Sequence, residues 1–122
     1  MPDSIAAPAA RYAHAVLTEG SGRWLHTSGV VPVAPDGSVP SDLEAQARVV
    51  WANIAAILES AGLGVSDIVS ITTYVVAGLS LAPVMGVRDE VLDGHLGAST
   101  LVTVPALAQP EWSMEIAVVA AG

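Results

Sequence analysis

The residue with the clearest potential for chemistry is a glutamate near the C-terminus of the chain. Glu115 lies in the stretch Met114 to Val119, where strand alternation places it on one face with Ala117 and Val119. A carboxylate among apolar neighbours suits a group that takes a proton from water and passes it to a leaving amine. The same pattern also fits a glutamate that points into solvent from an edge strand, so the residues alone leave both interpretations open.

A second group of candidates lies near the N-terminus. Tyr12 shares a predicted strand face with His14 and Val16, and its hydroxyl can either line a cleft or belong to an aromatic ring that only packs. Ser28-Gly29 ends the next predicted strand. A glycine there lets a ligand approach the backbone closely, although a plain turn glycine fits the pattern equally well.

The sequence lacks the residue patterns that several other kinds of site need. His14, His26 and His95 have no ligand-like spacing, and the chain has no cysteine, so we predict no metal site. The sequence contains no phosphate-binding loop, no G-x-S-x-G nucleophile turn and no complete dinucleotide glycine pattern. We therefore expect a site that works without a cofactor.

Composition narrows the class of protein further. The 122 residues fit one domain, 1–122, in which 1–10 form an N-terminal segment. Four Lys and Arg residues against twelve Asp and Glu residues give a formal charge of −8, which argues against nucleic acid and anionic membranes as partners. The N-terminus lacks the features of a signal peptide, and no apolar run approaches the length of a membrane span, so we expect a cytoplasmic protein.

The first half of the chain predicts a hairpin followed by a helix. Tyr12 to Leu17 and Arg23 to Ser28 are predicted strands joined by a glycine-rich loop. A capping box formed by Ser41 and Glu44 predicts the start of a helix, and Gly62 predicts its end in a left-handed cap. The helix has one apolar face, made by residues at three- and four-residue spacing: Ala47, Val50, Ile54, Ile57, Leu58 and Ala61.

The second half predicts a strand, a helix and two more strands. Ile68 to Val76 is rich in β-branched residues, and Ser80 precedes a helix that runs to about Asp93 with Pro83 in its first turn. Ser99 to Val104 and Ser113 to Ala120 complete the predicted order ββαβαββ, with a short extra strand near Val31 as an option. Two helices cover only one face of such a sheet. The other face is left uncovered, which indicates that the protein forms oligomers.

Five segments, in order and at matching spacing, carry a resemblance to the Rid (YjgF) family: Tyr12 to Val16, Thr27 to Pro32, Asp42 to Gly62, Gly97 to Val102, and Ser113 to Ala117. Its best-known members hydrolyse reactive 2-imino acids to 2-keto acids and ammonia. The resemblance implies an α+β, chorismate-mutase-like protomer with both helices on one face of the sheet. It also implies a barrel-like homotrimer with small-molecule clefts at the subunit boundaries.

The resemblance also implies roles for individual residues. Glu115 and Tyr12 match the residues that position the hydrolytic water and line the substrate pocket, so we predict them as the catalytic pair. The amide of Gly29 matches a position that binds the substrate carboxylate. The predicted ligand-binding set is Gly29, Val30, Ser99, Leu101 and His14.

One departure concerns the substrate. Members that process 2-imino acids carry an arginine where this chain has Ser99, and a serine cannot bind a carboxylate with a charged fork. The loss is worth about 1.5–3 kcal/mol of binding. Met85 and Leu96-Gly97 also differ from the family pattern, which indicates a remodelled pocket rim.

The sequence offers two other arginines, but neither is well placed to replace the family arginine at the position of Ser99. Strand alternation aims Arg11 away from the face of Tyr12, and Arg88 fits a solvated helix charge. We therefore expect a ligand that depends less on a carboxylate than a 2-imino acid does.

Three functions remain open at this point. The first is a homotrimer that binds a small carbonyl, imine or enamine compound and, if it is an enzyme, hydrolyses it with Glu115 and Tyr12. The second is an ordinary 2-iminobutanoate/2-iminopropanoate deaminase, as the resemblance implies. The third is a non-catalytic trimer that binds ligands or acts like a chaperone.

Overall fold

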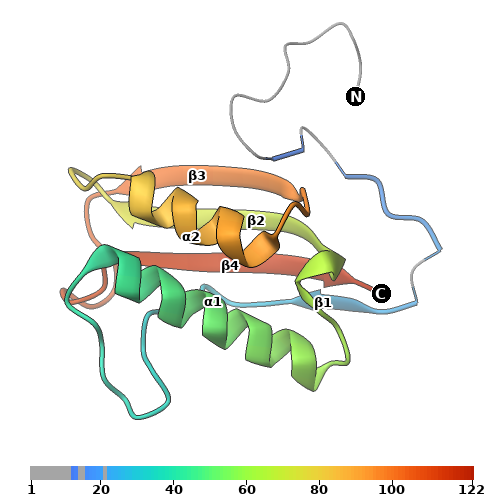
Figure 1. Ribbon diagram of the computed structural model, residues 1–122, viewed down its shortest axis with the longest axis horizontal. Helices are drawn as coiled ribbons and strands as arrows, with labels where there is room; N and C mark the ends of the chain where they lie inside the picture. Colours follow the sequence, from blue (N-terminus) through green and yellow to red (C-terminus); the bar gives the residue numbers. More distant parts are fainter. Residues whose placement is uncertain (1–11, 14–15, 21) are drawn as a thin grey trace, which may run out of the picture.

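The computed structural model describes residues 12–13, 16–20 and 22–122 of the chain. The two helices lie side by side on one face of a four-stranded sheet (Figure 1). This is the predicted α+β architecture. The elements in chain order are β1 (Trp24–His26), α1 (Leu43–Ser60), a 3-10 turn (Val65–Asp67), β2 (Ile68–Val76), α2 (Ala82–Leu92), β3 (Ala98–Val104) and β4 (Met114–Ala121).

The sheet is mixed, with the strand order β1-β4-β2-β3. Strands β2 and β3 are parallel because α2 connects them as a crossover, whereas β4 is antiparallel to both β2 and β1. A register shift between Ile68 and Ser70 marks a bulge in the β2–β4 ladder. Strand β3 is therefore an edge strand, and β4, with Glu115, lies inside the sheet.

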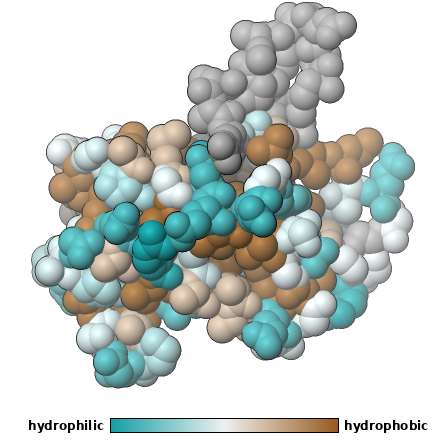
Figure 2. All heavy atoms as spheres, viewed as in Figure 1, coloured by the Kyte–Doolittle hydropathy of each residue, from teal (hydrophilic) through white to brown (hydrophobic). Residues whose placement is uncertain are grey.

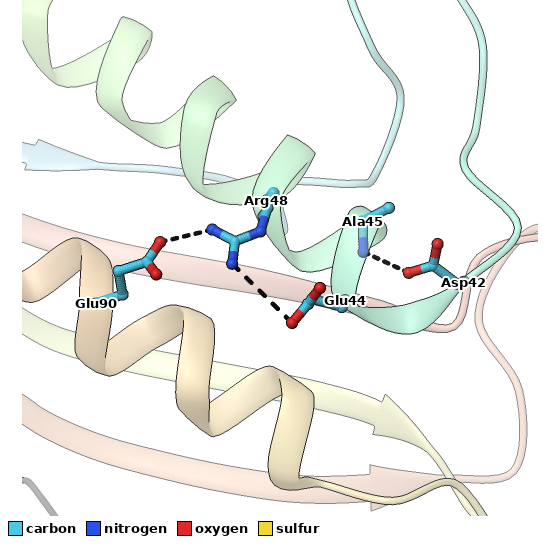
Figure 3. A network of polar contacts seen from close by, with 5 residues as sticks. All are labelled: Asp42, Glu44, Ala45, Arg48 and Glu90. Atoms are coloured by element: carbon cyan, nitrogen blue, oxygen red, sulfur yellow. Dashed lines mark hydrogen bonds and ion pairs between the residues drawn. The ribbon is translucent and has the colours of Figure 1, made fainter.

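Helix α1 begins where a side chain caps it. The carboxylate of Asp42 accepts a hydrogen bond from the Ala45 amide at 2.7 Å, so Asp42 is the cap in place of the predicted Ser41 (Figure 3). At the other end, the amide of Gly62, at φ 74°, donates to the Glu59 carbonyl. That geometry confirms the predicted left-handed end of the helix.

The hydrophobic core lies between the helices and the sheet. From α1, β2 and β4 it contains Ala47, Val50, Trp51, Ile54, Leu58, Ile71, Val75, Ile116 and Val118, each exposed by 2% or less. The alternate residues of the strands face the other way, where Trp24 and Val102 are exposed in a single chain. This uncovered side is called the open face below.

The predicted N-terminal hairpin is wrong for the described residues. Strand β1 pairs with β4 at the far end of the chain, and Ala13 forms a single parallel bridge with Ala98 of β3. Residues 16–20 form no strand. The predicted extra strand near Val31 corresponds to one bridge, between Val30 and Ile116.

Candidate functional site

A detour in the backbone after β1 brings Gly29 to Glu115. Thr27 donates its amide to the Val118 carbonyl at 3.0 Å and accepts the Val118 amide on Oγ1 at 2.9 Å. The chain then leaves β4 and returns at Val30, which exchanges hydrogen bonds of 2.7 and 3.1 Å with Ile116. Gly29 lies in the gap between these two attachments.

The carboxylate of Glu115 lies directly against the backbone of Gly29. A Cβ atom added to Gly29 would lie 1.8 Å from Oε2 of Glu115, so no side chain fits there while the carboxylate keeps its place. Glu115 is half-buried on the open face, opposite Tyr74 in the β2–β4 ladder. The structure thus brings together two predicted site residues, Gly29 and Glu115, whereas Val30 pairs with Ile116 and packs against the core.

Helix α1 holds the segment that follows Gly29. The side-chain amide of Asn53 donates to the carbonyl of Val33 at 2.9 Å and to that of Val31 at 3.4 Å. These bonds satisfy carbonyls that leave the β4 ladder beyond Val30. The position of the Gly29 backbone is therefore fixed from both sides.

Ser99 and Leu101 lie on the other face of the sheet, at its edge. In the β2–β3 ladder they pair with Ile71 and Thr73, whose side chains are buried under the helices. Beyond β3, the Ala13 amide donates to the Gly97 carbonyl at 2.9 Å. Ala13 forms an isolated bridge with Ala98, so its neighbour Tyr12 lies next to the β3 edge of the sheet.

The predicted residues therefore form two groups within one chain. Gly29 and Glu115 lie on the open face, whereas Ser99 and Leu101 lie on the helix side of β3 and Tyr12 lies next to the β3 edge. Strand β2 separates β4 from β3, so Tyr12 and Glu115 do not meet in a single copy. Two further candidates, His14 and Arg11, lie outside the described residues.

One residue differs sharply from the sequence-based expectation. Arg88 was predicted as a solvated helix charge, yet it is only 5% exposed. It follows Val84 and Val87 on the buried stripe of α2, at the spacing of core positions. That spacing is the sequence signal for the burial of Arg88. A buried arginine on an amphipathic helix needs a charged or polar partner.

The described part of one chain encloses no pocket, and none of its helices is both long and apolar enough to cross a bilayer. Within that same part, no three acidic or histidine side chains gather in a way that would hold a metal ion.

Comparison with known proteins places the whole chain in one family. The profile of the family described as Endoribonuclease L-PSP matches residues 3–122. A Yersinia pestis protein of unknown function from the conserved Rid family, YyfB, superposes with a TM-score of 0.84 at 34% identity, over 91% of this chain and 86% of that one.

Two Escherichia coli proteins are also similar. TdcF, solved with bound serine, gives a TM-score of 0.76 at 30% identity over 92% of this chain and 94% of that one. In sequence, this chain matches 75 residues of TdcF at 36% identity, which is 61% of this chain and 58% of TdcF. The 2-iminobutanoate/2-iminopropanoate deaminase is 51% identical over 55 residues, or 44% of this chain and 43% of the deaminase.

The aligned segments thus span less than three-fifths of these two curated relatives, whereas the family profile and the fold extend over nearly the whole chain. The chain belongs to the Endoribonuclease L-PSP family, the family of the Rid and YjgF proteins.

Proposed function

We propose that the protein is a cofactor-free hydrolase of small imines or enamines, acting as a homotrimer in clefts between copies. The observation that carries the proposal is the half-buried carboxylate of Glu115 held against the bare backbone of Gly29. In that arrangement Glu115 would act as a general base beside backbone that a small ligand can approach closely. The deaminase named among its relatives supports the same reaction class.

The reaction needs one water molecule and one group that moves a proton. Glu115 takes a proton from water as the water oxygen bonds to the imine carbon, and the C=N double bond becomes a single bond. The protonated carboxyl then gives that proton to the nitrogen. The carboxylate next takes the hydroxyl proton and passes it to the amino nitrogen as the C–N bond breaks. The C–O single bond becomes the carbonyl and ammonia leaves, so an imine and water become a carbonyl compound and ammonia.

The separation of the two residue groups supports a cleft built from two copies. Glu115 with Gly29 would come from the open face of one copy, and Tyr12, with Ser99 and Leu101, from the β3 edge of the next. In such a cleft the Tyr12 hydroxyl would hydrogen-bond the ligand, while the Gly29 segment would present backbone groups to it. Assembly would also cover the exposed apolar residues of the open face, among them Trp24 and Val102.

RNA cleavage, which the family description suggests, is not proposed. The formal charge of −8 and the four basic residues of the chain offer little to neutralise phosphates.

The test is the rate of imine loss with imines generated in place. An amino-acid oxidase supplies 2-iminopropanoate and 2-iminobutanoate, and an amine oxidase supplies an imine without a carboxylate. We expect wild-type protein to accelerate carbonyl formation above the uncatalysed rate, and Glu115→Gln to return it to that rate. The matched control is Glu111→Gln, an exposed glutamate four residues away, which should leave the rate unchanged.

Three results would contradict the proposal: no acceleration by wild-type protein on any of these imines, equal rates for wild type and Glu115→Gln, or an equal loss in Glu111→Gln. The first of these with tight ligand binding would instead favour a non-catalytic binding protein.

A further inference from the structure

Arg88 is a buried cation that has no role in the proposed mechanism. Its side chain is 6% exposed and stands in the same helical stripe as the core residues Val84 and Val87. Burying a guanidinium is costly unless charged or polar partners surround it. The buried charge of Arg88 therefore needs a charged or polar partner.

The direction of Arg88 follows from a neighbour on the same helix. Glu90 reaches across to Arg48 of α1 with an N–O distance of 2.6 Å, so its side of α2 faces α1 (Figure 3). Residues two positions apart on a helix differ by roughly 200° in direction. Arg88 therefore points away from α1, towards the β3 side of the sheet, over which α2 lies (Figure 1).

The position of Arg88 along α2 leads to the same place. Helix α2 runs antiparallel to β3 and ends at Leu92, and only residues 93–97 separate it from β3. Arg88 is one helical turn before Leu92, so it lies over the first half of β3. Ser99 is the second residue of β3, half-buried on the side that faces the helix. A serine there leaves more space beneath α2 than a long side chain would.

Among the residues that the structure describes, the guanidinium of Arg88 is paired with Asp89 alone. Oδ1 of Asp89 accepts both Nε at 3.1 Å and Nη2 at 3.0 Å, so a single oxygen atom takes two hydrogen bonds. A guanidinium has five N–H groups, and these bonds use two of them. The Asp89 side chain is 29% exposed, which puts this ion pair close to the surface on that side of α2.

We propose that Arg88 binds the carboxylate of the ligand, so that the carboxylate clamp comes from helix α2 and not from the strand position that Ser99 occupies. The substrate class is then an imine or enamine that carries a carboxylate, which revises the weak carboxylate dependence expected from Ser99 alone. This inference rests on the proposed function, because it places the ligand in the cleft that the β3 edge helps to form.

The test compares two ligands that differ in charge, pyruvate and its neutral amide, by titration calorimetry on the intact protein. We expect wild type to bind pyruvate about tenfold or more tightly than pyruvamide, since a charge-assisted fork is lost with the amide. Arg88→Met, which keeps an unbranched apolar stem but removes the charged end, should bind the two ligands equally. Arg48→Met, an exposed arginine on α1, is the control and should keep the preference.

Two further variants test whether the preference can be restored and guard against a loss of folding. Adding Ser99→Arg to Arg88→Met should restore the preference for pyruvate by returning a guanidinium to the same cleft from the strand. If Arg88→Met does not fold by circular dichroism, Arg88→Lys takes its place, and its preference should fall at least severalfold because lysine lacks the fork.

The outcomes separate this inference from the proposed function. Glu115→Gln should lose turnover but keep the preference for pyruvate, whereas Arg88→Met should lose that preference. The inference is overturned if wild type binds the two ligands equally or fails to bind pyruvate, or if the Arg88 variant that folds keeps the preference. None of these results bears on hydrolysis of the carboxylate-free imine, which tests the proposed function by itself.

Discussion

At the residue scale, the contact between Gly29 and Glu115 links backbone conformation to chemistry. The carboxylate occupies the space where any other residue would carry a Cβ, so its position depends on a missing side chain. Because Glu115 is flexible, a methyl group on Gly29 would push the carboxylate aside and would disturb the fold little.

Gly29→Ala should therefore reduce kcat/KM by about a hundredfold while the melting temperature stays within the error of the wild type, since misplacing a catalytic group by an ångström costs that much. The control is Gly64→Ala, because a Cβ at Gly64 meets nothing within 4 Å. A melting temperature that falls in step with activity would show that Gly29 is needed for folding and not for placing the carboxylate.

A second residue-scale prediction concerns pH. The Arg48 guanidinium, by its hydrogen bond and its charge, lowers the pKa of Glu90 from its ordinary value of 4.5 (Figure 3). Glu90 then stabilises the fold above that ordinary value, and the contribution disappears as the pH falls through the lowered one. Glu90→Gln should lower the melting temperature slightly near neutral pH and not at all in strong acid. A difference that persists in acid or in high salt would contradict this.

Sequence patterns predict one part of the candidate site but not the other. Alternation placed Glu115 on a face with Ala117 and Val119, which the β4 register confirms. The contact with Gly29 was out of reach, because it arises from a detour between two attachments to β4 that are distant in sequence. The prediction of a solvated Arg88 is wrong because its position on the apolar stripe of α2 buries it despite its charge.

At the scale of elements, a buried glutamine joins α1 to the loop before β4. Nε2 of Gln46 donates to the carbonyls of Pro40 and Glu111 at 2.8 and 2.9 Å, and its Oε1 accepts the Ser113 amide at 2.8 Å. The residue is 1% exposed, so water does not compete for these bonds. Gln46 thereby fixes Ser113, which directly precedes β4 and lies two residues before Glu115.

Gln46→Leu should lower the free energy of unfolding by about 2–4 kcal/mol, because it leaves two carbonyls and one amide buried without their partner. Chemical denaturation measures the change, and Gln109→Leu in the exposed part of the same loop is the control. An effect no larger than that of Gln109→Leu would mean that water satisfies the three groups.

Strand and helix positions show what local patterns can and cannot predict. The β-branched run predicted β2 over the residues that form it, Ile68–Val76. Periodicity predicted α1, and Ser80 with Pro83 predicted the start of α2. The hairpin failed because its second strand, which became β1, is hydrogen-bonded to β4, almost a hundred residues away. A glycine-rich loop allows a hairpin, but it does not outweigh a better partner elsewhere in the sheet.

At the scale of the whole molecule, the two sides of the sheet differ in what covers them. The helices cover one side and present a mixed surface, with hydrophilic residues between hydrophobic ones (Figure 2). On the other side, Trp24 and Val102 are exposed in a single chain. The proposed trimer would bury that open face.

Val102→Asp should therefore convert trimers into monomers and abolish turnover, since a charge cannot be buried there without a partner. Leu79→Asp is the control: it introduces the same charge at a residue that is 42% exposed, close to the 39% of Val102, but in the turn after β2. Analytical ultracentrifugation gives the mass of the assembly. A trimeric Val102→Asp variant would show that the open face lies outside the interface.

The central claim, that each site combines the open face of one copy with the β3 edge of another, is tested most directly by mixing two defective chains. Glu115→Gln and Tyr12→Ala are each expected to be inactive alone. In mixed trimers formed by co-expression at equal amounts, about a quarter of the subunit boundaries join an intact Glu115 to an intact Tyr12, so roughly a quarter of wild-type activity should return. Activity no greater than the average of the two separate variants would contradict the claim.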